Sequence, residues 1–99
     1  MNATRENTNQ KKVIWGTGSF SPSETIGKQK EVILFPKSLD SVPSVILVSW
    51  NDSENIFDYM SGINVLSYST TKDSFTVFSN RIKANASARW YFSYLAIME

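Results

Sequence analysis

The amino-acid sequence predicts an all-β protein, a six-stranded antiparallel β-sandwich. Short segments rich in β-branched and aromatic residues alternate with turn-forming stretches, as in sandwiches. No window carries an apolar stripe with the period of 3.6 residues that a helix would show over ten or more residues. The third observation is the closing segment from Arg89 to Met98, R-W-Y-F-S-Y-L-A-I-M, which is apolar at almost every position.

The closing segment is apolar on both faces of the strand that it predicts. Side chains of a strand alternate between its two faces. One face of this strand carries Trp90, Phe92, Tyr94, Ala96 and Met98, and the other carries Tyr91, Leu95 and Ile97. One face packs into the chain's own core, and the other needs a second burial partner. In a chain of 99 residues we expect that partner to be another copy, although the alternation does not say which face it covers.

The N-terminal half of the chain predicts a polar arm followed by three strands. Residues 1–10 are predicted to form the arm, either a frayed terminus or a segment that docks on a neighbouring subunit. The first strand covers residues 11–20, where Gly16 and Gly18 indicate a bulge or a close backbone approach. The second strand covers 28–35 before Pro36, and the third covers 44–50 after Pro43.

The C-terminal half predicts three further strands. Residues 54–62 form either one helical turn or an irregular loop that carries Phe57 and Tyr59 inward. Alternation resumes over 63–68, and a fifth strand covers 75–80. Residues 81–86 are predicted as a polar loop before the closing strand, which is expected to run over 87–97. The whole stretch 11–99 is thus predicted to be one domain.

Composition excludes several classes of function. The net charge of +1 disfavours a nucleic-acid binder. The absence of Cys and His removes disulfides, zinc and haem sites, and every nucleophile–His mechanism. Asp52, Glu54 and Asp58 lie in one stretch and could meet as a glycosidase pair, but a solvated polar loop is the stronger interpretation. We therefore expect no enzymatic activity, no cofactor and no metal.

The location of the protein is also predicted from the sequence. No run approaches the 18 apolar residues of a membrane helix, and the first residues lack the apolar region of a signal peptide. We therefore expect synthesis and folding in a cytoplasm, without membrane insertion.

Aromatic and basic residues near the strand ends are the candidates for ligand contacts. Flat faces for a sugar ring would come from Trp15, Trp50, Tyr59 and Trp90, although a place in the core or in a subunit interface is the stronger interpretation for each. A second group, in the segment before the closing strand, could donate hydrogen bonds to hydroxyl or carboxylate groups of a glycan: Asn80, Arg81, Lys83 and Asn85.

The order of the strand motifs resembles a known family. E-V-I-L-F-P, V-P-S-V-I-L-V-S-W, I-N-V-L-S-Y, S-F-T-V-F and W-Y-F-S-Y-L-A-I-M together resemble the H-type lectin domain and related lectin-like domains of bacteriophage tail fibres. The resemblance covers residues 11–98. It implies a six-stranded antiparallel sandwich that forms a homotrimer, with the last strands near the threefold axis and sugar bound between subunits.

The resemblance also implies positions for the sugar site. The family's early acidic residue falls near Glu24, its arginine near Gly62, and its aromatic–histidine pair near Ile82 and Lys83. The expected carbohydrate contacts in this chain are Glu24, Trp50, Asn80, Arg81 and Lys83. The expected trimer interface is formed by Trp90, Tyr91, Phe92, Tyr94, Leu95 and Ile97.

Two functions follow as expectations. The first is a non-enzymatic trimeric attachment module of a bacteriophage virion, in a tail fibre or baseplate, which binds host-surface carbohydrate and contacts other virion proteins through residues 1–10. The second is a purely structural virion protein, a fibre, decoration or adaptor protein, which binds protein and not sugar.

Overall fold

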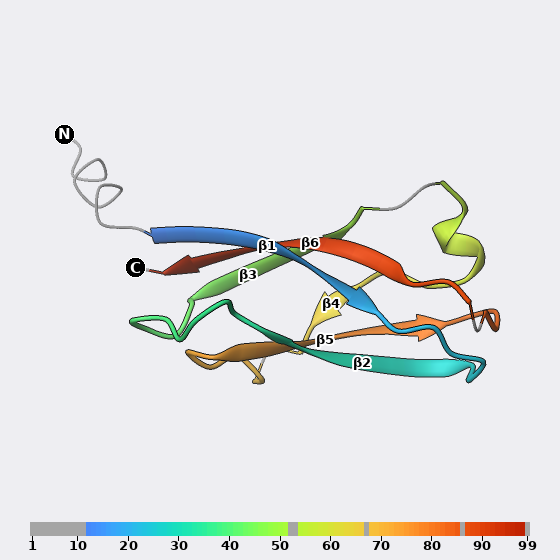
Figure 1. Cartoon of the computed structure of the whole chain (residues 1–99), viewed down its shortest axis with the longest axis horizontal. Helices are drawn as coiled ribbons and strands as arrows, with labels where there is room; N and C mark the ends of the chain where they lie inside the picture. The colour runs from blue at the N-terminus through green and yellow to red at the C-terminus, as the bar shows by residue number, and fades with distance from the viewer. Residues whose placement is uncertain (1–11, 52–53, 67, 86, 99) are drawn as a thin grey trace.

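The computed structural model describes residues 12–51, 54–66, 68–85 and 87–98. These residues form two three-stranded antiparallel sheets, which confirms the prediction of an all-β protein (Figure 1). Helical structure in the same residues is confined to a short 3₁₀ helix, η1 (Glu54–Asp58). The arm predicted for residues 1–10 lies outside the described part of the chain.

The first sheet is built around the closing strand. β6 (Trp90–Met98) lies in the middle, with β1 (Lys12–Phe20) on one side and β3 (Val45–Trp50) on the other. β1 runs antiparallel to β6 without interruption, from Lys12 opposite Met98 to Phe20 opposite Trp90. β6 is therefore the strand on which the whole sheet depends for its hydrogen bonds.

The second sheet is built around β5, the strand that precedes β6 in the chain. β5 (Ser74–Arg81) lies between β2 (Gly27–Leu34) and the short β4 (Asn64–Val65). Gly27, the first residue of β2, has a φ of 115°, a conformation that favours glycine because it has no Cβ. The chain passes from one sheet to the other after β1, β2, β3 and β5, and only β4 and β5 are both consecutive in the described chain and paired in one sheet.

The core lies between the two sheets and is contributed mainly by the inner faces of the central strands. β6 alternates between buried and more accessible positions along its length. Alternation alone could not say which face of this strand enters the core. The structure shows that it is the face with Trp90, Phe92, Tyr94, Ala96 and Met98. The inner face of β5 contributes Phe75 and Val77.

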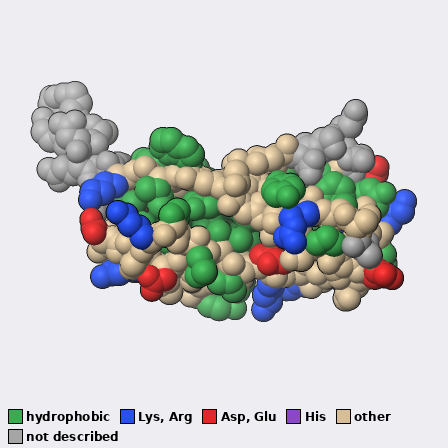
Figure 2. Space-filling view, in the orientation of Figure 1, with side chains coloured by type: hydrophobic (Ala, Val, Ile, Leu, Met, Phe, Trp, Pro, Cys, Tyr) green, Lys and Arg blue, Asp and Glu red, His purple; other side chains and the backbone are tan. Residues whose placement is uncertain are grey.

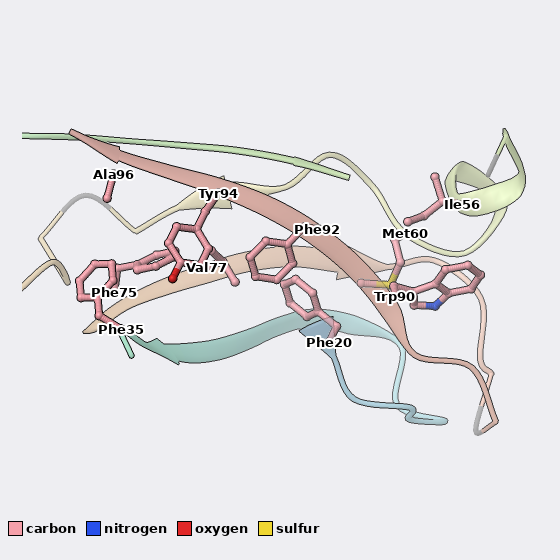
Figure 3. Packing of buried hydrophobic residues seen from close by; sticks show 10 residues of the cluster. All are labelled: Phe20, Phe35, Ile56, Met60, Phe75, Val77, Trp90, Phe92, Tyr94 and Ala96. Atoms are coloured by element: carbon pink, nitrogen blue, oxygen red, sulfur yellow. The ribbon is translucent and has the colours of Figure 1, made fainter. Parts of the chain in front are cut away.

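Aromatic rings fill much of this core (Figure 3). Phe35, Phe75 and Tyr94 form one cluster, with ring centroids 5.0 to 6.0 Å apart. Phe20 and Phe92 meet farther along β6, with centroids 5.9 Å apart. Such tilted and edge-on contacts are the favoured geometries of aromatic pairs. Burial raises the pKa of the Tyr94 hydroxyl above its ordinary value.

The two glycines of β1 provide space for two of these rings. A Cβ on Gly16 would lie 2.7 Å from the Tyr94 Oη atom, and a Cβ on Gly18 would lie 2.5 Å from Phe92 Cζ. Of the two alternatives that the sequence offered, close backbone approach is therefore correct, and the continuous β1–β6 register shows no bulge there. The rings of Tyr94 and Phe92 lie against the backbone of β1, and only glycine leaves enough space for them at these two positions.

Two local predictions need correction. Of the two alternatives for residues 54–62, the irregular loop with an inward Phe57 is wrong: Phe57 is exposed, and Ile56 and Met60 are buried among the described residues there. The cause is the 3₁₀ helix η1, in which neighbouring side chains point in different directions. Arg81 was expected to begin a loop, but it is the last residue of β5, where its backbone pairs with Gly27.

The contact between Gly18 and Phe92 gives a first prediction. Gly18→Ala should lower the free energy of unfolding by about 1–3 kcal/mol, because the buried Phe92 ring has no room to move away from a new methyl group. Gly62→Ala is the matched control, since a Cβ there meets nothing within 4 Å, and it should change stability by no more than about 1 kcal/mol. Urea unfolding of both variants measures the difference, and equal stabilities would contradict the packing described.

Candidate functional site

The structure brings most of the expected carbohydrate contacts to one end of the molecule. The segment 21–26, which holds Glu24, lies beside the segment 82–85, which holds Lys83, because Ser23 and Asn85 form an antiparallel bridge. The backbone N–H groups of Ser23 and Asn85 each donate to the other's carbonyl at 3.2 Å. We call these two segments, together with Asn80 and Arg81 at the end of β5, the loop end.

Three of the five expected contacts have exposed side chains at the loop end. Glu24, Asn80 and Lys83 are all exposed. The ammonium of Lys83 lies 5.2 Å from the centroid of the Tyr59 ring, which is half-buried. The hydroxyl of Ser61 accepts a hydrogen bond of 3.0 Å from the backbone N–H of Asn80. These residues offer one acidic, one amide and one basic group to a ligand.

Trp50 is not placed as a stacking platform. Its ring packs against Phe20 and Phe92, with centroids 5.5 and 6.3 Å away. Its indole Nε1 donates to the carbonyl of Ser61 at 3.0 Å. Trp50 lies on the inner face of β3, which the alternation Val45–Trp50 already indicates, so its ring packs against the core, and its contact with a sugar stays a prediction.

Arg81 is buried as well, with 1% of its surface exposed. It occupies the inner face of β5, where its Nη2 donates to the carbonyl of Ser21 at 2.9 Å. Its Nε and Nη1 have no hydrogen-bond partner in the described residues. Burial lowers the pKa of the guanidinium below its ordinary value. Arg81 is thus a structural residue of the loop end, and its expected role as a direct glycan contact is not supported.

Among the four aromatic residues considered for stacking, Trp15 alone is largely exposed, at 75%. Trp90 is buried, and its ring lies 5.3 Å from that of the half-buried Tyr59. Trp15 stands on the outer face of β1, an edge strand. If the protein has an aromatic platform in this set, it is Trp15.

The six residues expected at a subunit interface divide between the two faces of β6. Trp90, Phe92 and Tyr94 point toward the other sheet and are buried within one chain, so they are core residues. Tyr91 is 51% exposed, and Leu95 and Ile97 are partly exposed. The outer face of β6 therefore remains available for a partner.

Neighbouring strands extend this surface into rows across the first sheet. Ile97 pairs with a residue of β1 on one side and of β3 on the other, and so does Leu95. We call the resulting surface the apolar outer face: Val13, Ile97, Val45, Trp15, Leu95 and Leu47, with Tyr91 beyond them. Large patches of this kind mark interaction sites on soluble proteins.

A polar row separates Tyr91 from the rest of the apolar outer face. Thr17, Ser93 and Ser49 lie side by side across the three strands. The Ser93 hydroxyl donates to the side-chain oxygen of Asn51 at 2.7 Å. Because these side chains are small, a depression of about 300 Å³ forms beside them, bordered by the taller Trp15 and Leu47. A side chain from another molecule could enter it.

The outer face of the second sheet has a different chemical character. Lys28 and Lys30 lie there on β2, opposite Asn80 and Phe78 of β5. The Lys28 ammonium lies 5.4 Å from the centroid of the Phe78 ring. Farther along β2, Val32 and Leu34 are exposed, but their neighbours on β5 are Thr76 and Ser74, so that apolar strip is one strand wide.

Four members of the apolar outer face were absent from the interface predicted from the sequence. Val13 and Trp15 on β1, and Val45 and Leu47 on β3, were not assigned to an interface. The signal was present in the segment V-I-L-V, which is apolar at successive positions just as β6 is. What alternation could not supply was the sheet order, which places these two strands on either side of β6.

The acidic residues considered for catalysis do not form a described site. Asp52 and the side chain of Glu54 lie outside the described residues, and Asp58 is exposed. Among the residues that are described, no cluster of three or more acidic side chains could hold a metal ion. The described helical structure also contains nothing long and apolar enough to cross a membrane.

No protein-family model matches this chain, and no curated protein sequence matches it. The functional interpretation therefore depends on the chain's own residues.

Arg81 gives the second prediction. Arg81→Met should leave the free energy of unfolding unchanged or raise it by up to about 3 kcal/mol, because it removes a buried charge that is only partly hydrogen-bonded. Arg81→Lys should lower it by about 1–3 kcal/mol, because the charge stays buried and the bond to Ser21 is lost. Urea unfolding of both variants is the measurement, and a less stable Met variant would show that the guanidinium stabilises the fold.

Proposed function

We propose that the protein is a non-enzymatic recognition module that self-associates through the apolar outer face and binds carbohydrate at the loop end. The observation that carries this proposal is the apolar outer face itself. Two adjoining rows of large apolar side chains cross all three strands of one sheet, and the strand positions of that face carry no charged residue.

A second copy of the chain is the partner best suited to bury the apolar outer face. Among residues 1–11 only Met1 and Ala3 are apolar, so that segment does not supply an apolar cover. A face without charges can meet itself without like-charge repulsion, whereas the outer face of the second sheet would bring Lys28 and Lys30 against their own copies. Self-association therefore favours the first sheet and leaves the second in solvent.

The proposed assembly is a trimer with β6 nearest the axis. β6 is the middle strand of the apolar outer face, so a threefold axis running along it would bring Leu95 and Ile97 of the three copies together. The resemblance to H-type lectins favours three copies. The depression beside Ser93 provides room for a side chain of a neighbour.

Rotation about such an axis places the three loop ends on the same side of the assembly. Glu24, Asn80 and Lys83 are the proposed carbohydrate contacts, because all three are exposed there. Contacts from three shallow sites are weak one at a time, but they gain by avidity on a surface that repeats the same sugar. This is the geometry that host attachment by a bacteriophage tail fibre or baseplate would use.

The alternative function is a purely structural protein that forms the same assembly but binds no sugar. It is favoured by one observation: Trp50 and Arg81 are turned into the core, which leaves the loop end with few groups for a ligand. In that case the protein would be a fibre, decoration or adaptor component of a virion, and residues 1–10 would join it to other virion proteins.

The third prediction tests the interface. Leu47→Lys should weaken self-association by about 2 kcal/mol or more per interface, since it places a charge inside an apolar contact. Val32→Lys is the matched control, because Val32 is similarly exposed but lies on the outer face of the other sheet, and it should leave the assembly unchanged. Sedimentation of both variants gives the answer. Equal behaviour of the two variants would show that the apolar outer face is not the interface.

The fourth prediction tests the loop end. The double variant Asn80→Ala, Lys83→Ala should lose binding to the neutral glycans that the wild-type protein retains on a glycan array. Lys72→Ala is the matched control, because this exposed lysine precedes β5 at the end of that strand opposite Asn80, and it should keep that binding. If the wild-type trimer binds no glycan of any kind, the structural alternative is correct.

A further inference from the structure

A groove runs along the free edge of β1, toward the end of the molecule opposite the loop end. It lies between β1 and the segment 36–41 that follows β2, and it consists of two adjoining depressions of about 380 and 250 Å³. The depressions share three lining residues, Ile14, Lys37 and Leu39. They are therefore parts of one continuous groove, which we call the β1-edge groove.

The β1-edge groove has an excess of positive charge. Lys12 and Asp40 form an ion pair of 3.0 Å at its rim, and Lys37 lines both depressions. The pKa of Asp40 is lowered first by its hydrogen bond and charge interaction with Lys12, and further by the charges of Lys37 and Lys72. The lining of the groove thus carries two lysines and one carboxylate, and that carboxylate is already paired with Lys12.

The remaining surface of the groove is apolar, with hydroxyl groups at one side. Ile14, Leu39 and Met98 line the larger depression together with Ser38 and Ser41. Trp15 and Pro36 line the smaller depression. Figure 2 shows hydrophobic side chains beside Lys, Arg, Asp and Glu side chains at the end of the molecule where β1 begins. Exposed aromatic and apolar surface next to a cation is the combination that recognises a pyranose ring bearing an acid group.

We propose that the β1-edge groove binds an acidic saccharide, such as a uronic-acid unit of a polysaccharide. The carboxylate of the sugar pairs with Lys37, because Asp40 already engages Lys12. The less polar face of the ring lies on Ile14, Leu39 and the part of Trp15 that lines the groove, and the hydroxyl groups of the sugar meet Ser38 and Ser41. This site is separate from the loop end and does not depend on any contact made there.

The groove also adjoins the proposed subunit interface. Trp15 lines the smaller depression of the groove and also the depression on the apolar outer face. Substitution of Trp15 would therefore disturb both surfaces. Lys37 lines only the groove among these depressions, which makes it the position for a test.

The test compares Lys37→Glu with Lys30→Glu in the full chain. Both residues are exposed lysines, but Lys30 lies on the outer face of the second sheet. The probe is the trisaccharide of galacturonic acid, and binding is followed by tryptophan fluorescence, to which the exposed Trp15 responds most directly. We expect Lys37→Glu to weaken binding at least about fivefold and Lys30→Glu to change it less than about twofold. Equal losses in the two variants would overturn the assignment.

Two further probes separate this proposal from general charge attraction and from the loop end. A neutral galactose trisaccharide should bind the wild-type protein and the Lys37→Glu variant equally well. If the protein binds only neutral sugars, the proposal of an acidic-saccharide site in the groove is wrong, and the proposed function is unaffected. A tri-glutamate peptide should bind more weakly than the acidic trisaccharide. If the peptide binds equally well, the groove recognises charge alone, and the saccharide assignment is wrong.

Discussion

The closing strand β6 is apolar on both faces, and the rest of the structure depends on how each face is covered. The inner face packs against β5 and its neighbours, where each fully buried Phe or Met side chain contributes about 1.5–3 kcal/mol. The outer face has no cover within the described chain. Because β6 is the middle strand, its two neighbours widen this uncovered surface instead of hiding it. A single feature of the sequence therefore accounts for both the core and the surface that we assign to self-association.

The inner packing of β6 also constrains its neighbours. The rings of Tyr94 and Phe92 occupy the space where Gly16 and Gly18 lack side chains, so β1 approaches β6 with little tolerance for substitution. Trp50 packs against Phe92 of β6, and Arg81 is buried at the end of β5. The two ends of the sandwich consequently differ in chemistry: the loop end presents Glu24, Asn80 and Lys83, and the β1-edge groove presents lysines beside apolar surface.

Much of the fold could be predicted from the sequence, because period-two alternation and turn-forming residues are local signals. The strands were placed to within three residues at each end, apart from the shorter β4, and close approach was one of the two alternatives given for the glycines of β1. The candidate site was predicted less well. Arg81 and Trp50 carry polar groups that suggest ligand contacts, but their direction is set by register and by sheet order, which arise from pairing between distant segments. For the same reason the contribution of Val13 and Leu47 to the apolar outer face became visible only in the folded chain.

The central claim is that the apolar outer face is covered by other copies of the chain. The solution mass of the wild-type protein, measured by static light scattering over a wide range of concentration, tests this most directly. The account predicts a mass three times that of the 11.2 kDa chain, stable on dilution. A mass of one chain throughout that range would contradict it.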